Sequence, residues 1–224
     1  MATLQELESA IEAVLSGLSG YQNFDLVQRE EEKAYEAYVL ALCLTSIRNL
    51  GGRPILRGIL GKPNPFIFRG GPGLIHSQNR NYGYVFFTLN SLNFEIHVDI
   101  TIQGTSGMTH ELDVCIIRSE DADKCRRDEI NPLPASLFAG WECKFYSGTL
   151  DKNLGRAFVG LIDDMGNNIR LSGFCSNSNS GQLRKYFQPT RRPYCHFELT
   201  PSNSNNERRF LADLEVELKK LAGI

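Results

Sequence analysis

Metal-binding cysteine pairs, long apolar runs and a strong net charge are all absent from this chain of 224 residues. Its six cysteines form no Cys-x-x-Cys pair, which argues against a zinc site and favours buried free thiols. No apolar run approaches the roughly 20 residues that span a bilayer. The first eight residues carry acids rather than the basic-then-apolar order of a signal peptide, so we expect a cytoplasmic protein. We expect five thiols in apolar or strand-like surroundings and one in a charged loop: Cys43, Cys115, Cys143, Cys175 and Cys195, and Cys125.

Composition favours one globular domain of the α/β class. The hydrophobic fraction is 42% and the charged fraction 22%, both ordinary for a globular protein. A chain of this length can build a single core. We divide it into an N-terminal helical arm, a core, and a terminal part with a basic loop, a strand and a helix: residues 1–27, 28–175 and 176–224.

The order of apolar patterns indicates a central mixed β-sheet flanked by helices. Apolar residues recur at helical spacing in several segments, whereas shorter apolar or alternating runs indicate strands. The expected helices are residues 4–18, 28–50, 150–165 and 207–221. A turn-bounded strand end is expected at 66–73, and further strands at 84–89, 94–103, 111–117, 138–146, 169–175 and 194–199.

Ionisable residues interrupt two of these apolar strands. The first strand contains Glu111 and Asp113, and the second contains Glu142 and Lys144. Alternate residues of a strand point to the same face, so each pair projects together. Burying charges is costly unless they pair with each other or with a metal. If the two strands are neighbours, carboxylates and an ammonium group converge in a small volume.

Such a convergence suits hydrolysis of a phosphodiester by a divalent metal ion. Mg²⁺ or Mn²⁺ is held by one or two carboxylates together with water and phosphate oxygens. We expect Asp113 and Glu142 to hold the ion, which lowers the pKa of a bound water and neutralises charge on the phosphate. Lys144 would orient the attacking water or stabilise the transition state.

The pattern resembles that of the PD-(D/E)xK nuclease superfamily, in which an acid and a Glu-x-Lys triplet lie on adjacent strands of an α/β core. The matching residues are Asp113, Glu142 and Lys144, with 28 residues between the two acids. Leu112 stands where the pattern has proline. The resemblance covers about residues 30–175 and implies a restriction-endonuclease-like, three-layer α/β/α core. It also implies a metal contact from the backbone carbonyl of Cys143. The alternative is that Glu142 and Lys144 belong to a solvated strand face with a cross-strand ion pair.

The helix before the strands offers a further acid. Glu32 and Glu36 are four residues apart and share a helix face, and Glu36 stands where the helix becomes apolar. In the superfamily this helix often contributes a carboxylate to the site. The acids at the start of this helix would also interact favourably with its dipole. Glu36 is therefore a candidate site residue and Glu32 a weaker one.

A second group of ionisable residues alternates on the strand at 94–103. Glu95, His97 and Asp99 share one face by the period of two. They either line the site or face solvent, and we favour solvent.

The distribution of charge favours nucleic acid as the partner, although the formal net charge is only −2. Residues 1–50 hold eight acids and three bases, whereas residues 144–209 hold ten bases and five acids. Bases interleaved with aromatics suit a phosphate backbone. The Ser/Asn/Gly stretch 176–181 predicts a mobile loop, which alone would be a solvated charged loop. The candidate DNA-binding residues are Lys152, Arg156, Arg184, Lys185, Arg191 and Arg192.

Two functions remain open from the sequence. The first is a Mg²⁺-dependent deoxyribonuclease, an endonuclease of restriction or defence by association with the superfamily, or a repair enzyme for branched DNA. The second is a catalytically silent module of the same fold that binds nucleic acid or a protein. RNA stays open as a substrate. A homodimer is expected from the resemblance, with the C-terminal helix either at the interface or covering the sheet.

Overall fold

The computed structural model describes residues 2–148, 150–166, 169–188 and 193–223. Its helices are α1 Leu4–Leu15, α2 Glu31–Asn49, α3 Ser119–Asp128, α4 Lys152–Met165, α5 Gly181–Phe187 and α6 Ser204–Ala222, with a 3-10 turn at Pro134–Ser136. Its strands are β1 Phe24–Leu26, β2 Ile55–Gly58, β3 Phe66–Phe68, β4 Gly83–Leu89, β5 Leu92–Gln103, β6 Thr109–Arg118, β7 Leu137–Lys144, β8 Leu171–Ser176 and β9 Pro193–Phe197.

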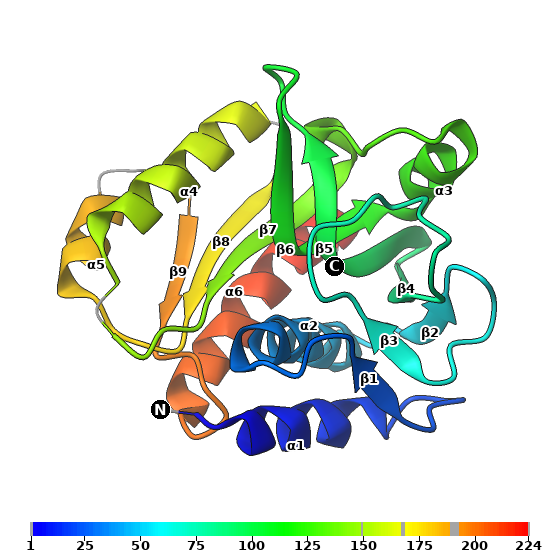
Figure 1. The fold of residues 1–224 in the computed structure, drawn as a ribbon, viewed down its shortest axis with the longest axis horizontal. Coiled ribbons are helices and arrows are strands. Elements are labelled where there is room, and N and C mark those ends of the chain that lie inside the picture. Colours follow the sequence, from blue (N-terminus) through cyan, green and yellow to red (C-terminus); the bar gives the residue numbers. More distant parts are fainter. Residues whose placement is uncertain (1, 149, 167–168, 189–192, 224) are drawn as a thin grey trace.

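Seven strands form one sheet in the order β2-β4-β5-β6-β7-β8-β9 (Figure 1). The neighbours from β2 to β7 are antiparallel, whereas β7, β8 and β9 run parallel. Parallel neighbours need a crossover connection, and α4 and α5 provide the two crossovers. β1 and β3 pair separately as a small parallel sheet. The α/β class with a helix-flanked mixed sheet, expected from the sequence, is confirmed.

Helices cover both faces of the sheet. α1, α2 and α6 contribute buried residues to one apolar cluster, which also contains Trp141 of β7. α3, α4 and α5 contribute to a second cluster that contains Phe174 of β8. The first cluster reaches from Ala2 to Ala222, so the N-terminal arm and the last helix share the core of the central residues.

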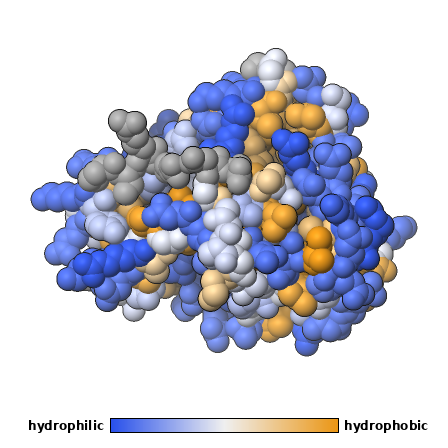
Figure 2. Space-filling model, turned by 90° about the horizontal axis from the view of Figure 1, so that it is seen from above, coloured by the Kyte–Doolittle hydropathy of each residue, from blue (hydrophilic) through white to orange (hydrophobic). Residues whose placement is uncertain are grey.

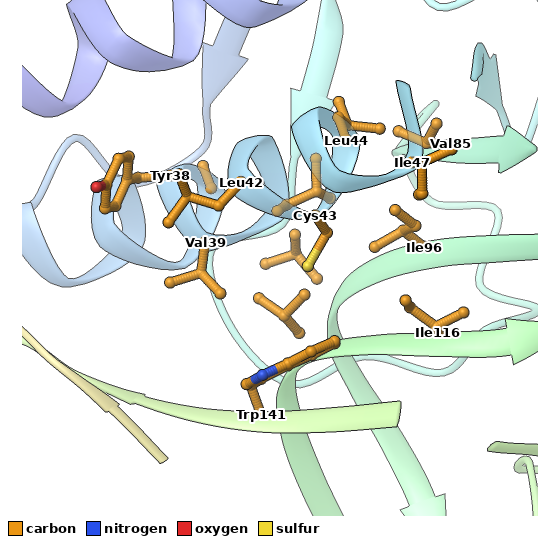
Figure 3. Close-up of a cluster of buried hydrophobic side chains, with 14 of the residues drawn as sticks. Tyr38, Val39, Leu42, Cys43, Leu44, Ile47, Val85, Ile96, Ile116 and Trp141 are labelled. Carbon is orange, nitrogen blue, oxygen red and sulfur yellow. The ribbon is translucent and has the colours of Figure 1, made fainter. Parts of the chain in front are cut away.

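α2 is buried on all sides. Its residues from Ala34 to Leu44 are all buried, because the helix lies between the sheet, α1 and α6. In Figure 3, Val39 and Cys43 face the strands that carry Ile96, Ile116 and Trp141. A helix that is apolar all round is one that lies inside a protein. Glu36 belongs to this buried stretch and is 2% exposed, so its carboxylate needs a partner.

Short or polar elements were not predicted from the sequence. β1, β2, α3 and α5 were missed, and Cys125 is buried in α3 rather than placed in a loop. The loop predicted for 176–181 is shorter in the structure, at residues 177–180, and its mobility stays a prediction. Ser176 ends β8, and the hydroxyl of Ser180 caps α5 by accepting a hydrogen bond from the amide of Leu183 at 3.2 Å. Serine and asparagine favour helix caps as well as loops, and the composition alone does not separate these roles.

The outer surface is largely hydrophilic where it can be seen. In Figure 2, hydrophilic residues dominate the face viewed from above, and hydrophobic residues form separate smaller groups. Among the described residues, none of the helices combines the length and apolarity needed to cross a membrane.

Glu95 and His97 are buried in an ionic network, so the expectation that they face solvent is wrong. Arg126 of α3 donates to both carboxylate oxygens of Glu95 at 2.7 and 2.8 Å, and His97 Nε2 lies 2.8 Å from the same carboxylate. Burial alone would raise the pKa of Glu95, but these hydrogen bonds outweigh it and lower the pKa to about 2. Arg126, the partner of Glu95, belongs to α3, a helix in a charged segment that was not predicted from the sequence.

Replacement of Arg126 by Met should destabilise the fold by about 3 to 5 kcal/mol, because it leaves the carboxylate of Glu95 buried without its main counter-charge. Denaturant unfolding at pH 7 measures the loss. The control is Arg127→Met, since Arg127 is exposed and forms no ion pair within the described residues. Equal stability of the two variants would contradict the importance of this network.

Candidate active site

The structure brings together the three residues of the predicted motif. β6 and β7 are antiparallel neighbours, with Val114 opposite Trp141, so Asp113 and Glu142 lie at the next position along the pair. Lys144 Nζ lies 2.7 Å from Glu142 Oε1 and 3.7 Å from Asp113 Oδ2. The backbone amide of Cys143 donates to Asp113 Oδ2 at 2.6 Å. This amide fixes the orientation of the Asp113 carboxylate.

Helix α2 adds Glu36 to this group. Lys33, one turn earlier on α2, donates to both oxygens of Glu36 at 2.9 and 3.1 Å. Lys33 also donates to Asp99 of β5 at 2.9 Å. Of the two carboxylates that were candidates on α2, Glu36 therefore lies in this group, whereas Glu32 is exposed.

Asp99 lies at the site and is fully buried, so the favoured expectation that it faces solvent is wrong, and the alternative that it lines the site holds. Its φ of 53° lies in the left-handed region, which is rare for aspartate, and it interrupts the alternation of β5. Before it, Ile96 and Val98 pack into the cluster beside α2; after it, Ile100 and Ile102 pack into the cluster on the opposite face. This shift turns Asp99 toward Lys33, away from the face it would share with Glu95 and His97 in a regular strand.

Glu36, Asp99 and Asp113 form a buried carboxylate triad. One oxygen from each lies within 4.8 Å of the other two. The Oδ2 atom of Asp99 and Oε1 of the nearby Glu111 are buried and receive no hydrogen bond from the described residues when both carboxyls are ionised. A proton on Glu111 would let its carboxyl bond to Asp99. Oxygen ligands are those that Mg²⁺, Mn²⁺ and Ca²⁺ prefer. A buried carboxylate oxygen that lacks a donor fits a cation, and the triad therefore suits a hard divalent ion.

The local charge is strongly unbalanced. Five carboxylates (Glu36, Asp99, Glu111, Asp113 and Glu142) meet two ammonium groups (Lys33 and Lys144). Burial, followed by the nearby carboxylates of Asp99 and Asp113, raises the pKa of Glu36. Burial and the charge of Glu142 raise the pKa of Asp113 to about 7, and burial together with Asp99 raises that of Glu111 to about 7.

The two lysines respond in the opposite direction. Burial disfavours their charged forms, but the surrounding carboxylates outweigh it, so the pKa values of Lys33 and Lys144 are raised. Both are therefore ammonium groups at neutral pH. Lys33 covers two members of the triad, and Lys144 bridges the third to Glu142.

The predicted metal ligands and the observed triad overlap only at Asp113. Glu142 lies at the same edge but is paired with Lys144, and the triad instead includes Glu36 and Asp99. The backbone of Cys143 contacts Asp113 through its amide, and a metal contact from its carbonyl stays a prediction. The expected roles of Glu142 and Glu111 stay predictions in the same way.

The candidate DNA-binding residues lie on the helices that follow β7. Lys152 and Arg156 are exposed on α4, and Lys185 is exposed on α5. Arg184 is half-buried, where it donates to Asn179 at 3.0 Å and lies over the ring of Phe197. Arg191 and Arg192 lie outside the described residues. Within the described ranges, no ion pair or hydrogen bond joins Lys152, Arg156, Arg184 or Lys185 to the triad.

Comparisons with protein-family models, curated proteins and solved structures find no match to this chain. The arrangement of side chains is therefore the basis for the function proposed below.

The raised carboxyl pKa values predict a stability that depends on pH and on metal. The pKa values of Asp113 and Glu111 in the unfolded chain are 3.8 and 4.5, and both are raised to about 7 on folding. Their contribution to the free energy of unfolding is therefore fully present below about pH 4 and is lost as the pH rises through about 7. A divalent cation at about 100 times its Kd should raise the melting temperature at pH 8 by about 5 °C or more. The rise should be smaller at pH 5.5, where protons compete with the metal.

The matched variants are Asp99→Asn and Asp128→Asn, the latter at an exposed position of α3. Asp128→Asn should show the wild-type rise with Mg²⁺ or Mn²⁺, whereas Asp99→Asn should lose most of it. An equal rise in both variants would show that the triad does not bind the cation.

Proposed function

We propose that this protein is a metal-dependent nuclease that hydrolyses phosphodiester bonds in DNA by the chemistry of the PD-(D/E)xK superfamily. The observation that carries the proposal is the contact of Lys144 with both Asp113 and Glu142 beside a buried carboxylate triad. An ion pair on a solvated strand face would not need three further buried acids. The buried carboxylates instead form a place where a divalent cation can bind, and the bound cation can neutralise the charge of a phosphate.

The residues divide into two roles. Asp113, Asp99 and Glu36 would hold a divalent ion, which when bound supplies an activated water and charge neutralisation at the phosphate. Lys144 places a protonated ammonium group next to that position and stabilises negative charge that develops on the phosphate oxygens. Glu142 keeps Lys144 in place through the 2.7 Å ion pair. The amide of Cys143 keeps Asp113 in place at 2.6 Å.

Lys33 is the counter-ion of Glu36 and Asp99 when no metal is bound. Its Nζ lies 2.9 Å from both Glu36 and Asp99, so a divalent ion at the triad competes with this ammonium group for the same carboxylates. Lys33 is partly exposed and its side chain is long, which allows it to withdraw toward the surface. It would then lie near a phosphate bound to the ion.

The biological setting is proposed from the superfamily alone. We propose a role in restriction or defence, with the protein acting as a dimer in the cytoplasm and using Mg²⁺ or Mn²⁺. Cleavage confined to branched DNA would favour a repair role, and cleavage of RNA would change the substrate class.

The purified protein should cut supercoiled or linear DNA with Mg²⁺ or Mn²⁺ and should be inactive in EDTA. Asp113→Asn and Lys144→Met should each reduce the rate on the order of 100-fold or more, because each removes an interaction with the reacting phosphate or its metal. Gel assays on linear, supercoiled, single-stranded and branched DNA and on RNA measure this. Asp128→Asn, exposed and outside the site, should retain full activity. Cleavage by both site variants at the control rate would refute the assignment, and binding without cleavage by wild type would favour the silent module.

A further inference from the structure

A groove with no acidic lining lies next to the carboxylate triad. Its volume is about 470 Å³, and its walls come from the loop after β3, the residues before β4, and Thr101 of β5. The lining includes Arg69, the glycines of residues 70–73, Ser77, Asn79 and Tyr82, but no aspartate or glutamate. A groove beside α1, by contrast, is lined by Glu8, Glu12 and Asp25 together with Arg29. The groove next to the triad thus differs from that one in having a basic residue and no acid in its wall.

Backbone hydrogen bonds tie this groove to the site. The amide of Gly73 donates to the carbonyl of Asp99 at 3.0 Å, and the amide of Thr101 donates to the carbonyl of Gly73 at 3.0 Å. The loop that contains Gly73 thus runs alongside β5 next to Asp99, where the side chains of β5 change from one face of the sheet to the other. In Figure 1 this loop crosses in front of β5. One wall of the groove continues directly into the backbone that carries Asp99.

The charged group in the wall is a guanidinium held in place by its neighbours. Arg69 is 6% exposed, lies 4.1 Å from the centre of the Tyr82 ring and donates to the carbonyl of Leu74 at 3.2 Å. A Cβ at Gly73 would approach Arg69 Nη1 to 2.3 Å, so glycine is what allows the guanidinium to lie there. Within the part of the chain that the structure describes, Arg69 has no carboxylate in salt-bridge contact, although the charge of Asp99 acts on it from a longer distance. No carboxylate therefore occupies the hydrogen-bond positions that a phosphate would take.

The glycine loop also offers backbone donors. Within the described residues, the amides of Gly70 and Gly71 have no hydrogen-bond partner, and a Cβ at Gly71 would meet no atom within 4 Å. Unpaired amides beside a fixed guanidinium form a setting for a phosphate group. The hydroxyl and amide groups of Ser77, Asn79 and Tyr82 add donors and acceptors for a sugar or a base.

We propose that this groove binds the substrate strand, taking the nucleotide next to the phosphate that is cut. The phosphate of that nucleotide lies against Arg69 and the amides of Gly70 and Gly71, and the sugar or base lies toward Tyr82. This inference rests on the proposed nuclease function and deepens it. It assigns to a glycine loop the strand positioning that the sequence assigned only to basic residues after β7.

Gly71 allows a test that leaves the fold intact. It has no positive φ and open space where a side chain would begin, so Gly71→Glu introduces a carboxylate at the groove without a clash. Gly71→Gln adds the same volume without the charge. Ala13→Glu adds the same charge on the exposed face of α1. The melting temperatures of all three variants should equal that of wild type.

The binding measurement is fluorescence anisotropy with a labelled single-stranded oligonucleotide of about 12 nucleotides, in Ca²⁺ to prevent cleavage, accompanied by a cleavage assay in Mg²⁺. Gly71→Glu should weaken binding roughly tenfold or more by like-charge repulsion, and should raise KM far more than it lowers kcat. Gly71→Gln should show a smaller loss, and Ala13→Glu none.

The outcomes separate the two proposals. Cleavage by wild type together with unchanged binding and KM in Gly71→Glu would overturn the groove assignment and leave the nuclease function standing. Binding that falls in Gly71→Glu but not in Ala13→Glu, without cleavage by wild type, would support the groove and overturn the nuclease. If wild type neither binds nor cuts, both proposals fail.

Discussion

The interaction on which the site depends is the burial of several carboxylates at one junction of the sheet with too few cations to balance them. Glu36, Asp99 and Asp113 are each at most 5% exposed, yet their oxygens approach within 4.8 Å. Isolated buried charges of one sign are strongly unfavourable, so the group must take up protons, ammonium ions or a metal. The folded chain uses Lys33 and Lys144 for part of this compensation, and an oxygen of Asp99 still lacks a donor.

The topology explains how these acids reach one place from four parts of the chain. The antiparallel run β5-β6-β7 sets Asp113 beside Glu142 and Lys144, and the left-handed residue in β5 turns Asp99 to the side of α2. α2 can deliver Glu36 because it is buried between the sheet and two helices. The same reversal in β5 lies alongside the glycine loop, so the feature that completes the carboxylate triad also positions the proposed groove.

The part of this arrangement that could be predicted from sequence follows from regular geometry. Asp113, Glu142 and Lys144 were predictable because two apolar strands with a period of two fix which residues share a face, and Glu36 because its helix becomes apolar at that point. Asp99 was not predictable, since the period of two places it with Glu95 and His97 and its reversal depends on one backbone angle. The burial of Glu95 depends on Arg126, a partner 31 residues away.

The central claim is that the carboxylates of Glu36, Asp99 and Asp113 hold a divalent cation. Diffraction from crystals soaked in Mn²⁺, recorded for the anomalous signal of manganese, tests it most directly. The account predicts a peak at about 2.1 Å from oxygens of Asp113 and Asp99, with the ammonium group of Lys33 displaced from the triad. A saturating soak with no peak at coordination distance from Asp113, or with Lys33 still bound to Glu36 and Asp99, would contradict it.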